Sequence, residues 1–145
     1  LELHGQEQVL EVGTGSGYQT AVLSLLAASV VSVERHAALS QVAFEKLHAL
    51  GCENVTLVVG AGTRGWPASA PYDRILVTAA GALLPPALWQ QLAEGGVLVA
   101  PLGPADDQVL QVIRKIDGCP VTASLTHCRF VPLIGEPVGE GENES

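Results

Sequence analysis

The chain has 145 residues, of which 48% are hydrophobic and 15% are charged, and its formal net charge at pH 7 is −8. This length suits one domain with its own core, and the hydrophobic content excludes a chain that stays disordered. The seven Lys and Arg residues form no basic cluster of the kind that binds nucleic acid or an anionic membrane, so we expect neither partner.

The sequence contains no methionine and starts at Leu1, which we interpret as a piece of a longer polypeptide. Its three cysteines, Cys52, Cys119 and Cys128, show no CxxC spacing. We expect free or buried thiols in a reducing cytoplasm, with a catalytic thiol or a zinc ligand as the alternative. The longest apolar stretch, residues 21–33, is interrupted by serines and is shorter than the ~20 residues that a membrane helix needs. From the cysteines we expect a cytoplasmic protein.

The first half of the chain alternates strand-like and helix-like segments. Short apolar or β-branched runs predict strands, and apolar residues at helical spacing predict amphipathic helices. In chain order these segments are a strand at 8–12, a helix from 18, a strand at 29–33, a helix at 36–50 and a strand at 54–59. Gly51 supplies the expected C-terminal stop of the second helix.

The middle of the chain continues this alternation. Residues 74–78 predict a fourth strand, Pro85-Pro86 opens a helix, Gly95-Gly96 is expected to end it, and residues 97–100 predict a fifth strand. Continuous apolar strands between helices indicate a parallel sheet that is covered on both faces. The fold expected is a doubly wound α/β domain.

The pattern changes beyond Pro104, where no helix is predicted. Residues 108–116 and 121–133 are two extended segments around Asp117-Gly-Cys-Pro120, and so short a turn joins only antiparallel strands. The sheet should therefore end in an antiparallel hairpin. We expect one domain over residues 1–134 and a disordered, acidic, glycine-rich tail over 135–145 with a solvating role.

The strongest local signal is a glycine cluster after the first strand. Glu11-Val12 closes that strand, and Gly13-Thr14-Gly15-Ser16-Gly17 leads into the helix. Glycines in such a turn let the backbone approach a ligand at the helix N-terminus. Because the GxGxxG position of dinucleotide-binding loops is occupied here by Tyr18, the spacing favours a nucleoside ligand over a pyrophosphate.

An acidic residue follows the second strand at a suitable distance. Glu34 lies 21 residues after Gly13, where a carboxylate accepts hydrogen bonds from both hydroxyls of a ribose. A solvated acid at a strand end is the alternative for Glu34. The glycine turn and Glu34 together resemble S-adenosylmethionine-dependent methyltransferases.

Further motifs narrow this resemblance to the bacterial protein-L-isoaspartate O-methyltransferases. They run in order along the chain: Val9-Leu-Glu-Val-Gly-Thr-Gly-Ser-Gly-Tyr-Gln-Thr20, Val33-Glu-Arg35, Gly65-Trp-Pro67, Ala70-Pro-Tyr-Asp-Arg-Ile-Leu-Val-Thr-Ala-Ala80, Gly95-Gly96 and Arg129-Phe-Val-Pro-Leu133. The resemblance implies a class I methyltransferase fold. It also implies methyl transfer from S-adenosyl-L-methionine to the α-carboxylate of L-isoaspartyl residues in damaged proteins.

This methyl transfer depends on the alignment of the reacting atoms more than on proton transfer. The acceptor carboxylate is ionised at neutral pH, so a catalytic acid–base pair is not required. The four histidines, His4, His36, His48 and His127, lack metal-ligand spacing, and we expect no metal. Isoaspartyl proteins or peptides are the expected partners, and we expect a monomer.

The chain departs from the family pattern in two places. The family carries an N-terminal segment with a catalytic serine, which has no counterpart among these residues, and Ser16 should not be mistaken for it. Gly60-Ala61-Gly62 stands where the family has Gly-Asp-Gly, whose aspartate is expected to accept a hydrogen bond from the adenine amino group. Losing that contact should weaken cofactor binding by about 0.5–1.5 kcal/mol.

The resemblance and the turn together define the candidate site. The expected cofactor-binding residues are Glu11, Gly13, Thr14, Gly15, Ser16, Gly17, Glu34, Arg35, Gly60, Ala61, Gly62 and Thr78. The expected substrate-groove residues are Ala79, Ala80, Arg129, Phe130 and Val131. For Thr78 a strand-capping role is the alternative, and Phe130 and Val131 suit a hairpin core equally well.

Three other functions remain open at this point. One is a cofactor-binding module without catalysis, which the missing serine and Ala61 favour. Another is a methyltransferase with a different acceptor. A nicotinamide-dependent dehydrogenase is the third, and the glycine spacing disfavours it.

Overall fold

The computed structural model describes residues 1–79, 81, 83–104 and 106–128, the last three by their backbone. The domain boundary expected at residue 134 and the tail expected at 135–145 lie outside these residues. The elements in chain order are β1 (Gln8–Val12), α1 (Tyr18–Leu26), β2 (Ser29–Glu34), α2 (Ala37–Ala49), β3 (Val55–Val59), the 3-10 turns η1 (Gly62–Arg64) and η2 (Pro67–Ser69), β4 (Tyr72–Val77), α3 (Pro86–Gln91), β5 (Leu92–Leu102), β6 (Gln108–Ile116) and β7 (Cys119–Cys128).

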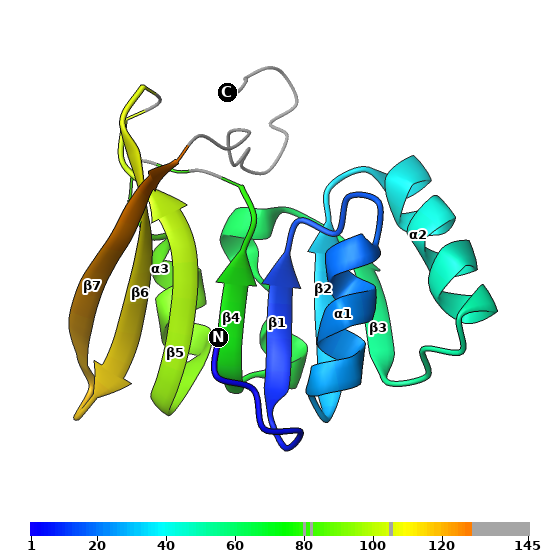
Figure 1. Cartoon of the computed structure of the whole chain (residues 1–145), viewed down its shortest axis with the longest axis horizontal. Coiled ribbons are helices and arrows are strands. Elements are labelled where there is room, and N and C mark those ends of the chain that lie inside the picture. Colours follow the sequence, from blue (N-terminus) through cyan, green and yellow to red (C-terminus); the bar gives the residue numbers. More distant parts are fainter. Residues whose placement is uncertain (80, 82, 105, 129–145) are drawn as a thin grey trace.

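The strands form one seven-stranded sheet in the order β3-β2-β1-β4-β5-β6-β7 (Figure 1). β1 to β5 pair in parallel, and β6 and β7 pair antiparallel at the end of the sheet. The doubly wound, mostly parallel sheet with a terminal hairpin is thereby confirmed. The chain order reverses beside β1, which lies between β2 and β4, and such a switch point is where open α/β sheets bind ligands.

Helices cover both faces of the parallel strands. In Figure 1, α1 and α2 lie in front of the sheet and α3 lies behind it. Successive side chains of β1 point to opposite faces, so Val9 packs with Leu23 of α1 while Leu10 and Val12 pack in the cluster that contains Leu88 of α3. None of the helices in the described part of the chain is long and apolar enough to cross a membrane.

The prediction that Gly95-Gly96 ends the third helix is wrong. α3 ends at Gln91, and the glycine pair lies inside β5. The β4–β5 register jumps from Tyr72 opposite Leu92 to Arg74 opposite Val97, so β5 bulges at the glycines. A Cβ on Gly96 would lie 3.0 Å from the carbonyl oxygen of Asp73, which explains a glycine in the bulge.

The hairpin turn is shorter than expected from the sequence. Only Asp117 and Gly118 lie between β6 and β7, with φ of 54° and 73°, and β7 already begins at Cys119. Two central residues with positive φ form the tight turn that matches the twist of paired strands. The carboxylate of Glu94 accepts the backbone N–H groups of both turn residues.

A buried and an exposed leucine test this assignment of the core. Leu10 of β1 is 0% exposed, whereas Leu25 of α1 is 83% exposed. Leu10→Ala should lower the free energy of unfolding by about 2–5 kcal/mol because it leaves a cavity. Leu25→Ala, with the same change in side chain, should alter it by less than about 0.5 kcal/mol. Urea unfolding of both variants measures the difference, and similar effects would contradict the fold.

Candidate functional site

A glycine-rich turn joins β1 to α1 at the edge of the sheet where the parallel strands end, the upper edge in Figure 1. Gly13, Gly15 and Gly17 have φ of 104°, 55° and 87°. Side chains disfavour this left-handed region, so the three glycines are required by the path of the backbone. The turn therefore has the shape that the sequence motif predicts.

Thr78 lies against the first glycine of the turn. Its hydroxyl is 2.9 Å from the carbonyl oxygen of Val12 and 3.0 Å from that of Gly13. A Cβ on Gly13 would lie 2.3 Å from the Thr78 Oγ1 atom, so no larger residue fits at this position. These contacts are those of a threonine that caps the ends of two strands. Thr78 thus supports the turn where it begins, through the carbonyl groups of Val12 and Gly13.

The other two glycines face different surroundings. A Cβ on Gly17 would lie 3.1 Å from the Cβ of Ala43, so this glycine allows α1 to start close to α2. A Cβ on Gly15 would meet no atom within 4 Å. The backbone of the turn therefore borders open space at Gly15.

Glu34 ends β2 beside this turn and is buried. One of its carboxylate oxygens accepts the backbone N–H of Gly15 at 2.9 Å, and the other accepts that of His36 at 2.9 Å. A carboxylate oxygen has two lone pairs, so each retains the capacity to accept a further hydrogen bond. The carboxylate is thus fixed in place by two backbone N–H groups and keeps a lone pair on each oxygen.

The end of β3 completes this edge of the sheet. The backbone N–H of Gly60 donates to the carbonyl oxygen of Glu34, and Ala61 is buried before Gly62 opens η1. The side chain at 61 offers no polar group. Arg35, which follows β2, is half-buried, and its Nε has no hydrogen-bond partner among the described residues.

Glu11 lies in β1, next to the last residue of the strand before the turn. Its side chain lies on the α1 face of the sheet and is 0% exposed, and its Oε1 atom accepts the hydroxyls of Thr20 and Ser32. Burial raises the pKa of Glu11; the two hydroxyls oppose this rise, and the nearby charge of Glu34 adds to it. Glu11 therefore joins β1 to side chains of α1 and β2 in the buried layer next to the turn.

Sequence reasoning missed three residues that hold this region together. Thr20 and Ser32 bind Glu11, and a polar residue within an otherwise apolar helix face or strand was the available signal. Gln91 of α3 was also missed: its side chain accepts the backbone N–H of Trp66 at 3.0 Å and donates to the carbonyl oxygen of Arg64 at 2.8 Å. Gln91 thereby holds the loop after η1.

The candidate cofactor residues come from the carboxyl ends of neighbouring strands β1 to β4, where the topology brings them to one edge. Ser16 is exposed in the turn, and Ala79 is half-buried after β4. The remaining substrate-groove residues, Ala80, Arg129, Phe130 and Val131, lie outside the described residues.

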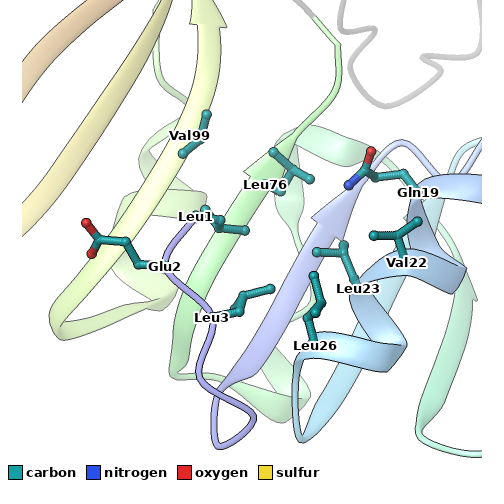
Figure 2. Close-up of a pocket in the computed structure, with 9 residues that line it drawn as sticks. All are labelled: Leu1, Glu2, Leu3, Gln19, Val22, Leu23, Leu26, Leu76 and Val99. Atoms are coloured by element: carbon teal, nitrogen blue, oxygen red, sulfur yellow. The ribbon is translucent and has the colours of Figure 1, made fainter.

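A separate apolar groove of about 370 Å³ lies on the α1 face of the sheet. Figure 2 shows its lining side chains, which come from the N-terminal residues, α1, β4 and β5: Leu1, Glu2, Leu3, Gln19, Val22, Leu23, Leu26, Leu76 and Val99. None of the candidate cofactor residues lines this groove. The groove and the glycine turn are therefore distinct features of the molecule.

The sheet order, the terminal antiparallel strands and the glycine turn after β1 define the fold of the class I S-adenosylmethionine-dependent methyltransferases. A solved protein-L-isoaspartate O-methyltransferase superposes with a TM-score of 0.84 at 34% identity, over 90% of this chain and 43% of that chain. A Plasmodium falciparum protein assigned to the same enzyme, in complex with S-adenosyl-L-homocysteine, has a TM-score of 0.76 at 26% identity, over 88% of this chain and 65% of that one.

The sequence comparison identifies the family. The model of the protein-L-isoaspartate(D-aspartate) O-methyltransferase (PCMT) family matches residues 1–137, and the chain belongs to this family. The protein-L-isoaspartate O-methyltransferase of Dictyoglomus turgidum is 50% identical over 136 residues, which cover 94% of this chain. The match covers only 62% of the Dictyoglomus protein, so the chain spans about three fifths of its curated relative.

The buried carboxyl of Glu11 yields a prediction about pH. Its pKa in the folded protein is raised above the ordinary value of 4.5, so the stability that it contributes is full below that pH and is lost as the pH rises through the folded pKa. Glu11→Gln cannot titrate. The variant should therefore gain stability relative to the unchanged protein as the pH rises from below 4.5 through the folded pKa of Glu11.

Urea unfolding over this pH range measures this gain, with Glu53→Gln as the control because Glu53 is exposed. A difference between Glu11→Gln and the unchanged protein that stays constant with pH, or that shifts against the variant, would contradict a raised pKa of Glu11.

Proposed function

We propose that this chain binds S-adenosyl-L-methionine and serves an enzyme that methylates the α-carboxylate of L-isoaspartyl residues in damaged proteins. The observation that carries the proposal is the carboxylate of Glu34, held by the backbone N–H of Gly15 beside the open side of the glycine turn. The family membership supports the same reading, and so does the S-adenosyl-L-homocysteine in the related Plasmodium structure.

The described residues fit the nucleoside part of this cofactor. The two oxygens of Glu34 each have a free lone pair, which suits the two hydroxyls of a ribose. Gly15 leaves open space for the rest of the ligand to approach the turn. At the end of β3, where the base would lie, the side chain of Ala61 offers no polar group.

The chemistry needs little from this chain beyond binding and alignment. S-adenosylmethionine supplies a methyl group on a sulfonium, which is a good leaving group. A bond forms between the carboxylate oxygen and the methyl carbon while the carbon–sulfur bond breaks, and no proton has to move. The strand ends and the turn would hold the reacting atoms in line and keep water away from them.

Labelled methyl transfer to peptides tests the activity. The chain is incubated with S-adenosylmethionine and an isoaspartyl peptide, with the aspartyl peptide of the same sequence as the control. Base-labile label on the isoaspartyl peptide alone is the expected result. Binding of S-adenosylhomocysteine without transfer would favour a cofactor-binding module, and transfer to other carboxylates only would favour a different acceptor.

The proposal includes a monomer in a reducing cytoplasm. The free thiols of Cys52 and Cys119, the two cysteines whose side chains are described, support the compartment. Size-exclusion chromatography with light scattering tests the monomer, and a dimer at micromolar concentration would contradict it.

Glu34 should carry much of the cofactor affinity. Glu34→Ala removes a charged acceptor of two ribose hydroxyls, each worth about 1.5–3 kcal/mol, and should weaken S-adenosylhomocysteine binding at least about tenfold. Glu53→Ala removes the same charge from an exposed position before β3 and should change the dissociation constant by less than about twofold. Titration calorimetry compares the two, and equal losses would rule out a specific role for Glu34.

Restoring the family's acidic residue at position 61 should strengthen cofactor binding. Ala61→Asp supplies an acceptor for the adenine amino group and should lower the dissociation constant of S-adenosylhomocysteine by about two- to tenfold. S-inosylhomocysteine, in which an oxygen replaces that amino group, should gain nothing. An equal gain for both ligands, or none for either, would contradict the proposed place of the adenine.

A further inference from the structure

A buried series of two hydroxyl groups and one carboxyl group lies directly beneath the glycine turn. Thr14 of the turn, Ser32 of β2 and Glu11 of β1 are 4%, 0% and 0% exposed. The Oγ1 of Thr14 is 2.5 Å from the Oγ of Ser32, which is 2.7 Å from the Oε1 of Glu11. Three side chains from three segments of the chain thus form one continuous series of hydrogen bonds.

The direction of these hydrogen bonds follows from the number of protons. A hydroxyl carries one hydrogen, and that of Ser32 is donated to Glu11. The oxygen of Ser32 must then accept, so Thr14 donates its single hydrogen to Ser32. The side chain of Thr14 therefore has no donor left for a ligand, and its burial keeps it away from one.

We propose that Thr14 is a positioning residue, whose hydroxyl, anchored through Ser32 on Glu11, holds the glycine turn in the conformation that binds the cofactor. The inference rests on the proposed function, since it concerns the same cofactor site. Thr14 acts through the backbone: its carbonyl oxygen accepts the N–H of Gly17 at 2.9 Å, and the next N–H, that of Gly15, is held by Glu34.

The composition of the turn explains why such an anchor is needed. Thr14 lies between Gly13 and Gly15, which both have positive φ, and glycine has more backbone freedom than any other residue. A turn that samples several conformations binds a ligand more weakly, because binding must then restrict it. A side chain tied to the sheet removes this cost before the ligand arrives.

The test compares cofactor affinity with stability in matched variants. Thr14→Val keeps the shape of the side chain without its hydroxyl, and it should raise the dissociation constant of S-adenosylhomocysteine about three- to tenfold. Thr14→Ser keeps the hydroxyl and should restore the affinity to within about twofold. Titration calorimetry gives the affinities, and urea unfolding gives the stabilities.

Ser24→Ala is the control for a merely structural effect. The hydroxyl of Ser24 donates to the carbonyl oxygen of Ala21 within α1, outside the turn and outside the series of hydrogen bonds. This variant loses a hydroxyl as Thr14→Val does, and it should keep its affinity within about twofold. If Ser24→Ala weakens binding as much as Thr14→Val does, or if Thr14→Val binds as tightly as the unchanged protein, the positioning role is wrong.

A double-mutant cycle tests whether Thr14 and Ser32 affect cofactor affinity through the same series of hydrogen bonds. Thr14→Val and Ser32→Ala break the same series, so their effects on affinity should be clearly less than additive. Additive effects on affinity would mean that the two residues act independently, which would contradict the proposal. If the unchanged chain binds no S-adenosylhomocysteine, the proposed function fails and this inference with it; if it binds and Thr14→Val is equal to it, only the positioning role fails.

Discussion

The hydrogen bond between the backbone N–H of Gly15 and the carboxylate of Glu34 joins the two parts of the candidate site, the glycine turn and the acidic side chain. It ties the turn that follows β1 to the end of β2, two strands that pair in parallel beside the switch point of the sheet. The carboxylate is held in place and keeps a lone pair on each oxygen, which the proposed contact with a ribose requires. The sheet topology serves to bring these two groups together.

Two carboxylates hold neighbouring residues of the turn by different means. Glu34 lies at the edge of the sheet and binds the backbone of Gly15, whereas Glu11 lies in the interior and reaches Thr14 through Ser32. A buried carboxyl costs free energy in its charged form, which its raised pKa reflects. The candidate site thus combines one acid that we propose as the partner of the ribose with one that supports the backbone beneath it.

The sequence predicted the parallel strands and the glycine turn well, because apolar runs and glycine spacing are local signals. It did not predict the bulge at Gly95-Gly96, since that bulge depends on how β5 pairs with β4. It also missed the contacts of Glu11 with Thr20 and Ser32, which lie 9 and 21 residues away and meet only when α1 and β2 pack on β1. Pairing between distant segments, and not local preference, decides these features.

The central claim is that an adenosyl ligand binds where β1 and β2 end. A crystal structure of the chain grown with S-adenosylhomocysteine tests it most directly. The account predicts both ribose hydroxyls within hydrogen-bond distance of the two oxygens of Glu34, and the rest of the ligand along the turn at Gly15. A ligand bound in the apolar groove beside Leu23 and Leu76, or one that leaves Glu34 without contact, would contradict it.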